Sequence, residues 1–140
     1  MTTFRTEERA NVEVPAVGSD TVTSGIRIQV RPKYLQEHSD PNNERWVFAY
    51  RVNINNETAK TLRLRSRHWI IIDGDGQRHE VDGPGVVGLQ PDIQPGESFE
   101  YGSFCPLPTS WGTMEGFYVL EDEDGVELKA QIGRFFLVQD

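Results

Sequence analysis

The stretch Trp46–Ile54, WVFAYRVNI, decides the fold class of this chain. Its large apolar side chains stand at every second position, and Val, Ala, Arg and Asn occupy the positions between them. A helix would spread such a pattern around its whole circumference, whereas a β-strand gathers it on one face. The stretch therefore predicts a long β-strand with one face against a hydrophobic core.

Shorter patterns of the same kind lie on either side of this strand. Ile26–Val30 alternates apolar residues with Arg and Gln, and Pro32 either ends this strand or places it at a sheet edge. Leu62–Ile72 ends in three successive isoleucines, which favour a strand buried on both faces. Ser98–Cys105 and the segment from Phe117 to Val138 continue the series, the latter as a hairpin.

Turn residues separate these strands at short intervals. The chain holds 13 Gly and 8 Pro in 140 residues, and the segment 83–96 is too rich in both for a helix. About seven or more strands and no convincing helix predict an all-β sandwich, formed by residues 24–140 as one domain. Residues 1–23 are polar and predict an arm or an edge strand.

Charge and cysteine content limit the partners and the compartment. The net charge of −8 argues against nucleic acid and against an anionic membrane as partners. Cys105 is the single cysteine, so no internal disulfide forms, which fits a reducing compartment. The apolar runs are far shorter than the roughly 20 residues of a membrane span, and no signal pattern opens the chain. We expect a cytoplasmic protein.

Three glycines, Gly83, Gly85 and Gly88, match the G-x-G-x-x-G pattern of dinucleotide sites. That pattern works by opening a helix whose N-terminal amides hold pyrophosphate. Here Pro91 and Pro95 follow closely and exclude such a helix. The interpretation that remains is a structural glycine loop, although a nest of amides in it could hold a small anion.

Two histidines flank the predicted Asp73–Gly76 turn. His68 and His79, with Asp73 or Asp75, offer the imidazole and carboxylate groups that bind divalent transition metals. No tight ligand spacing supports that site. The alternative is that His68 hydrogen-bonds in a half-buried position and His79 is solvated.

No catalytic signature is present. Cys105 lacks an evident base, so we expect a small buried residue rather than a nucleophile. The acidic stretch Asp122–Gly125 with Glu127 lacks the full twelve-residue calcium-binding loop. We therefore interpret it as a hairpin turn. We expect a protein that is not an enzyme and that carries no cofactor.

An aromatic residue, Trp111, stands in the predicted loop Pro106–Gly112. It either anchors a partner or folds back on the core. If the two loops are neighbours, Gly83, Gly85, Gly88, Gln90 and Trp111 form one binding face for a protein or peptide. An exposed edge strand would also allow a homodimer.

Five short motifs resemble the ApaG family over most of the chain: Ser66–Trp69, Gly83–Pro91, Pro95–Gly96, Phe99–Tyr101 and Gly112–Tyr118. The resemblance implies a fibronectin-type-III-like sandwich, an association with cobalt and magnesium efflux, and kinship with interaction modules in eukaryotic F-box and polymerase-delta-interacting proteins. We therefore expect a non-enzymatic binding module. The alternative is a regulatory protein linked to divalent cations or phosphate compounds.

Overall fold

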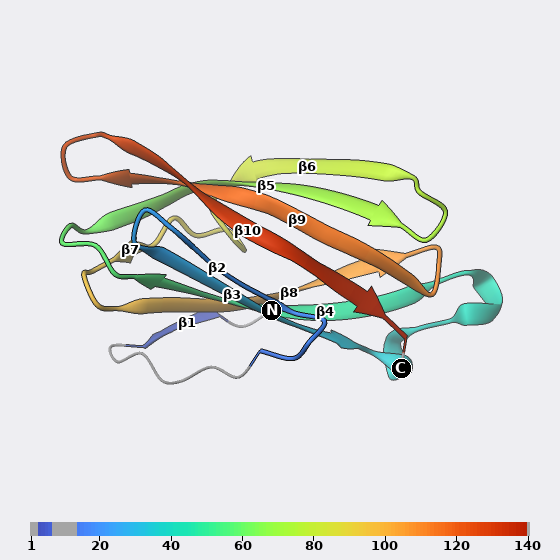
Figure 1. The fold of residues 1–140 in the computed structure, drawn as a ribbon. Coiled ribbons are helices and arrows are strands. Elements are labelled where there is room, and N and C mark those ends of the chain that lie inside the picture. Colours follow the sequence, from blue (N-terminus) through green and yellow to red (C-terminus); the bar gives the residue numbers. More distant parts are fainter. Residues whose placement is uncertain (1–2, 7–13, 140) are drawn as a thin grey trace.

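The computed structural model describes residues 3–6 and 14–139, and these form a sandwich of two antiparallel sheets (Figure 1). The strands are β1 (Thr3–Thr6), β2 (Ser19–Thr23), β3 (Ile26–Tyr34), β4 (Trp46–Asn56), β5 (Leu62–Asp73), β6 (Arg78–Pro84), β7 (Asp92–Ile93), β8 (Ser98–Leu107), β9 (Trp111–Asp122) and β10 (Glu127–Val138). Two single-turn 3₁₀ helices, Gln36–His38 and Pro41–Asn43, lie between β3 and β4. The predicted fibronectin-type-III-like β-sandwich is confirmed.

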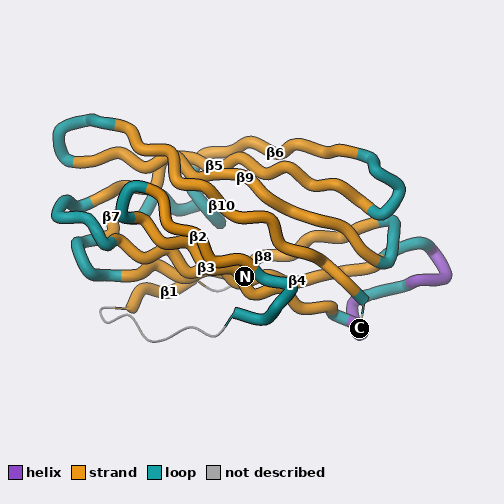
Figure 2. Tube along the Cα trace, viewed as in Figure 1, coloured by secondary structure: helices purple, strands orange, loops and turns teal. Residues whose placement is uncertain are grey.

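The strand order explains which edges are free. One sheet, called sheet I, has the order β1-β8-β4-β3-β2, and the other, sheet II, has the order β10-β9-β5-β6, with β7 against the end of β5. Figure 2 shows the strands running along the molecule with turns gathered at its two ends. Within the described residues β2 and β6 are therefore edge strands of the two sheets.

One long side of the sandwich, the closed side, is sealed. There β10 of sheet II packs against β2 and β3 of sheet I (Figure 1). Direct hydrogen bonds join the two layers there: the Thr21 hydroxyl of β2 donates to the Gln131 carbonyl of β10 at 2.8 Å, and the Phe136 amide of β10 donates at 2.8 Å to the carbonyl of Val17 in the turn before β2.

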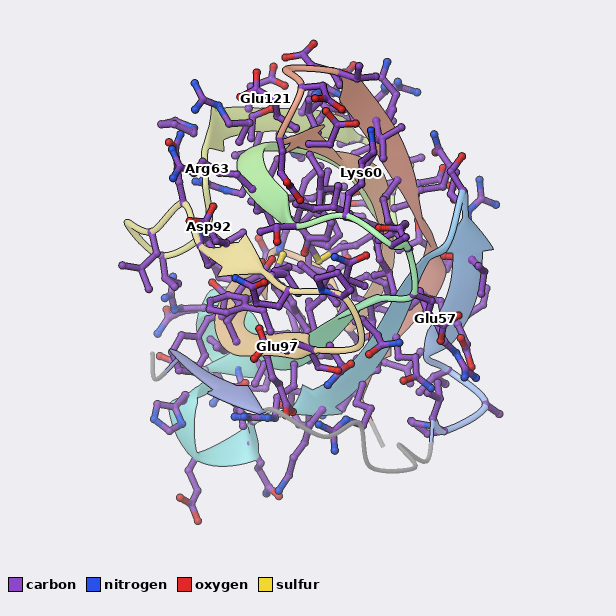
Figure 3. The ribbon with its side chains drawn as sticks, turned by 90° about the vertical axis from the view of Figure 1, so that its left-hand side faces the viewer. Glu57, Lys60, Arg63, Asp92, Glu97 and Glu121 are labelled. Atoms are coloured by element: carbon purple, nitrogen blue, oxygen red, sulfur yellow. The ribbon has the colours of Figure 1, made fainter. Side chains whose placement is uncertain are left out.

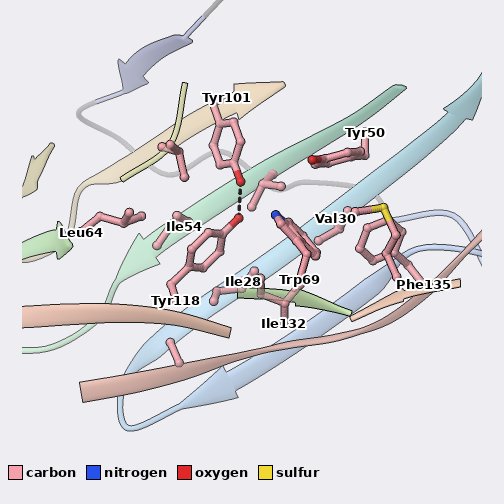
Figure 4. Close-up of a cluster of buried hydrophobic side chains, with 14 of the residues drawn as sticks. Ile28, Val30, Tyr50, Ile54, Leu64, Trp69, Tyr101, Tyr118, Ile132 and Phe135 are labelled. Carbon is pink, nitrogen blue, oxygen red and sulfur yellow. Dashed lines mark hydrogen bonds between the residues drawn. The ribbon is translucent and has the colours of Figure 1, made fainter. Parts of the chain in front are cut away.

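The core follows the period-two pattern of β4. Phe48, Tyr50, Val52 and Ile54 are all buried, as the sequence predicts. Figure 4 shows this core, in which the ring of Trp69 packs edge-on to that of Tyr50, 5.4 Å away between centroids.

Two tyrosines lie in the same core. Tyr101 of β8 and Tyr118 of β9 come from opposite sheets, are 2% and 0% exposed, and share a hydrogen bond between their hydroxyls (Figure 4).

Two strand predictions need correction. Ile70, Ile71 and Ile72 are half-buried rather than buried on both faces, because the other sheet covers only the inner face of β5: Ile70 and Ile72 lie on the outer face, and Ile71 lies on the inner face beside the edge strand β6. Pro32 does not end its strand, which continues to Tyr34. It lies at the part of β3 that β2 no longer covers, so the edge alternative is right.

The structure also corrects the predicted position of Trp111. Trp111 is the first residue of β9 rather than a loop residue, because β8 and β9 continue into a shorter turn than the composition suggests. Of the predicted N-terminal arm or edge strand, 1–23, residues 1–2 and 7–13 lie outside the described residues.

Candidate functional site

A cleft of about 590 Å³ opens on the side of the sandwich opposite the closed side, which we call the open side. Its mouth lies between two strand edges that no other described strand covers. One is β6, and the other is the part of β8 after Tyr101, because among the described residues β1 pairs with β8 from Ser98 to Tyr101. The cleft lies within the usual size range of ligand sites, roughly 300–1,000 Å³.

The walls of the cleft are mainly apolar. The rings and aliphatic chains that line it come from both sheets: Trp69, Ile71, Val81, Phe104, Leu107 and Met114. Trp69, Leu107 and Met114 are almost fully buried, whereas Phe104 is 47% exposed at the mouth. The cleft therefore leads from solvent directly to the hydrophobic core.

One cation lies among these apolar walls. Arg67 lines the cleft and is half-buried, and its Nη1 donates to the carbonyl of Pro84 at 3.1 Å and of Gly85 at 2.9 Å. Among the described residues no carboxylate lies within 4.0 Å of its guanidinium, and no hydrogen bond satisfies its Nε or Nη2. The guanidinium thus retains donor groups that a ligand can use.

A β-bulge turns Arg67 inward. In the pairing of β5 with β9 the register shifts between Leu64 and Ser66, so that one extra residue, Arg65, lies in β5. The bulge changes which residues face the core: Leu64 faces it before the bulge, and Trp69 and Arg67 face it afterwards.

The glycine-rich loop holds this bulge in place. The Arg65 carbonyl accepts hydrogen bonds from the Gly85 amide at 2.8 Å and from Nε2 of Gln90 at 3.0 Å. Gly83 leaves the space that the guanidinium of Arg67 occupies, since a Cβ there would lie 2.9 Å from its carbon and nitrogens.

The backbone of the loop explains the glycine pattern. Gly85 has φ +57°, and a Cβ on it would lie 2.0 Å from the Leu89 carbonyl oxygen. Val86 and Leu89 exchange backbone hydrogen bonds across a tight turn, in which Val87 and Gly88 both have positive φ. The structural interpretation of the G-x-G-x-x-G pattern therefore accounts for these residues.

The two predicted binding loops do not adjoin one another. The glycine loop follows one end of β6, whereas Trp111 lies at the other end, where its ring contacts the hairpin turn at Gly74. About eight residues of β5 separate the two sites, which is roughly 26 Å. Gly83, Gly85, Gly88, Gln90 and Trp111 thus flank the cleft at its two ends rather than line it.

The predicted metal residues are also separated. His68 lies on the outer face of β5, where Nε2 contacts Glu80 at 3.1 Å, Nδ1 contacts Asp82 and the ring stacks on Phe117. His79 pairs with Ile71 in the β5–β6 register and faces the cleft, on the opposite face of the hairpin. In the described part of the chain, no group of three or more His, Cys, Asp or Glu side chains is arranged so that it could hold a metal ion.

Asp73 has a structural role in the hairpin. Its Oδ1 accepts the amides of Asp75 at 2.9 Å and Gln77 at 3.0 Å, which fixes the turn between β5 and β6. Asp122 makes the equivalent bonds to the amides of Asp124 and Val126, which lower the pKa of its carboxyl. The hairpin interpretation of the segment 122–125 is thus confirmed.

Cys105 is buried at 5% exposure beside the cleft. Burial raises the pKa of its thiol to about 12. A thiol with that pKa stays protonated at neutral pH and is a poor nucleophile.

Charged side chains gather at one end of the sandwich (Figure 3). Arg63 of β5 pairs with Asp92 of β7 at 2.9 Å, and Lys60 pairs with Asp124 at 2.6 Å. Within each exposed pair the two charges neutralise each other, and such surface pairs contribute little to the free energy of unfolding. None of the helices in residues 3–6 and 14–139 is long and apolar enough to cross a membrane.

Fold and cleft together define a class of protein: a fibronectin-type-III-like β-sandwich with an apolar cleft on the open side, between the edges of its two sheets. The family model described as the ApaG domain matches residues 36–122. The chain belongs to the ApaG family.

Individual relatives agree with this assignment. Protein ApaG of Methylobacterium sp. (strain 4-46) is 50% identical over 82% of this chain and 88% of its own length. Protein ApaG of Dechloromonas aromatica (strain RCB) is 48% identical over 85% and 94%. The crystal structure of a putative ApaA protein from Bordetella pertussis has a TM-score of 0.79 at 46% identity, over 81% of this chain and 93% of that one. No catalytic activity is named for these proteins.

Proposed function

We propose that this protein is a non-enzymatic binding module that receives an extended segment of a partner protein in the cleft on its open side. The observation that carries the proposal is the cleft itself: an apolar opening of about 590 Å³ that reaches the core between two strand edges that no other described strand covers. Exposed β-strand edges bind extended peptides by adding a strand to the sheet, and adjoining pockets receive alternate side chains.

The flanking loops fit this role as supports. Because the glycine loop fixes the bulge that orients Arg67, and Trp111 packs at the far end of the β5–β6 hairpin, both act on the shape of the cleft. The alternative function in divalent-cation regulation or phosphate binding remains a prediction from the sequence. No specific contact in the described residues favours it, since His68 and His79 lie on opposite faces of the hairpin.

The proposal can be tested by photo-crosslinking in cells. A benzophenone amino acid at Val81, 40% exposed at the cleft mouth, should yield a discrete adduct with a partner segment. The same group at Val22, 58% exposed on the edge strand of the closed side, is the matched control and should not yield that adduct. Mass spectrometry then identifies the crosslinked segment.

A second step makes the test decisive. The crosslinked segment, prepared as a synthetic peptide, should bind the purified protein in calorimetry, and Val81→Trp should abolish binding while Val22→Trp leaves it unchanged. Equal binding by both variants would refute a site in the cleft. An adduct with a second copy of this chain would instead indicate the edge-strand homodimer, which sedimentation would then detect.

A further inference from the structure

Arg67 gives the cleft a chemical preference that apolar walls alone would not give. Its guanidinium lies at the end of the cleft next to Gly83, while Leu107 and Ile71 line the other end. A half-buried cation that faces solvent through an apolar opening is incompletely hydrated, and a carboxylate that replaces the missing water gains a charge-assisted hydrogen bond.

The field of this cation also reaches into the core. The pKa values of Tyr50, Tyr101 and Tyr118 are raised chiefly by burial, and Arg67 acts on all three in the opposite direction. The positive charge of Arg67 is therefore felt inside the sandwich without a neutralising side chain among the described residues within 4.0 Å.

We infer that the cleft recognises an acidic side chain within an extended, otherwise apolar segment of a partner protein, and that Arg67 binds its carboxylate. The inference rests on the proposed function. An internal segment is favoured over a free chain end because, among the described residues, no strand pairs with the outer edge of β6 over its whole length, so that a partner strand can pass both ends of the cleft.

The register of β6 gives the spacing of the segment. His79, Val81 and Gly83 share the inner face of β6 at alternate positions, and Arg67 lies directly opposite Gly83. A strand paired with β6 would direct every second side chain to the same face. The acidic residue should therefore lie opposite Gly83, with apolar residues two and four positions away on one side.

The outer face of β6 favours the opposite charge. There Glu80 and Asp82 outnumber Arg78, and the side chain of Asp82 is 75% exposed. Cross-strand neighbours of opposite charge stabilise a pairing. Basic residues between the cleft-facing ones would also offset the net charge of −8.

The test uses blocked heptapeptides titrated into the purified full chain, with binding followed by amide NMR shifts. The probe peptides are Ac-KEKLKIK-NH2 and its reverse, Ac-KIKLKEK-NH2, because the strand direction is open, and the controls carry Gln in place of Glu. We expect the better Glu peptide to bind roughly ten-fold or more tightly than its Gln control, with shifts at β6 and at β8 beyond Tyr101.

Variants of the protein assign the preference to Arg67. Arg67→Gln should bind the Glu and Gln peptides equally, Arg67→Lys should retain a reduced preference for Glu, and Arg78→Gln, on the outer face of the same hairpin, should retain the full preference. Near-UV circular dichroism verifies that the variants are folded.

Each other result overturns the inference in a recognisable way. If the Glu and Gln peptides bind in the cleft with equal affinity, the cleft does not select an acidic residue. The inference about Arg67 is then wrong, whereas the proposed function is still supported. If Arg78→Gln removes the preference as fully as Arg67→Gln, the effect is general electrostatics. Tighter binding of a Gln peptide with a free carboxyl terminus would identify a chain-end site, and no binding by any peptide at millimolar concentration would exclude such segments.

Discussion

The hydroxyl pair of Tyr101 and Tyr118 yields a prediction whose magnitude follows from the structure. Both side chains are buried, and among the described residues each hydroxyl has only the other as partner (Figure 4). Tyr118→Phe would leave the Tyr101 hydroxyl buried without a partner, which costs about 1–3 kcal/mol of unfolding free energy. Tyr101→Phe should cost a similar amount.

The double variant distinguishes pairing from simple loss of polar groups. Replacing both tyrosines by Phe removes donor and acceptor together, so its cost should fall short of the sum of the single costs by at least about 1 kcal/mol. For a chain of 140 residues, each kcal/mol corresponds to roughly 3–5 °C in melting temperature.

Alkaline pH provides an independent measurement of the same pair. Burial raises the pKa of both hydroxyls above the ordinary value for tyrosine. The folded protein therefore keeps protons that the unfolded chain loses, and stability falls as pH rises past about 10. The double Phe variant should lose stability less steeply, by up to about 1.4 kcal/mol per pH unit for each tyrosine removed.

Urea unfolding followed by tryptophan fluorescence would measure all four proteins, because Trp69 packs edge-on against Tyr118 with ring centroids 6.2 Å apart. Additive costs in the single and double variants would refute the pairing. An unchanged alkaline slope in the double variant would show that the two hydroxyls do not hold their protons as the structure requires.

Three further predictions follow from single residues. Gly85→Ala should destabilise the protein by clearly more than Gly88→Ala in thermal melts, because both have positive φ but only Gly85 would place a Cβ against a backbone oxygen; equal losses would contradict this. The Cys105 thiol, with its pKa raised to about 12, should react with iodoacetamide at pH 8 much more slowly in the folded than in the urea-unfolded protein, and equal rates would argue against its burial. Combined His68→Ala and His79→Ala substitutions should leave weak cobalt binding unchanged in calorimetry, whereas a large loss would indicate a shared site.

The sequence predicts a strand and its buried face correctly where apolar residues alternate clearly within that strand. The alternation in Trp46–Ile54 reports which face is buried without any knowledge of neighbours, so the prediction holds. The prediction for Ile70–Ile72 is wrong, because their burial depends on whether another layer covers the outer face of the sheet and on how close β5 lies to the sheet edge. Both are properties of the whole sandwich and cannot be read from one strand.

The cleft was harder to predict because residues from five strands line it. Arg67 belongs to a motif that the sequence singles out, yet its direction depends on the bulge at Arg65. One signal was available: Leu62 and Leu64 stand at even positions whereas the buried Trp69 stands at an odd one, and such a change of phase within a strand indicates a bulge. Which strand edge would face β6 could not be read from any local pattern.

The closed and open sides of the sandwich have different tasks. The closed side stabilises the fold, whereas the open side determines which partner segment can bind. The strands β3, β4 and β10 hold half of the buried hydrophobic residues and lie away from the cleft mouth, whereas nearly all residues of β6 are exposed. Substitutions at exposed positions usually change stability by less than about 0.5 kcal/mol. Related chains can therefore vary the side chains of β6, and with them the sequence of the segment that is accepted, at almost no cost to folding.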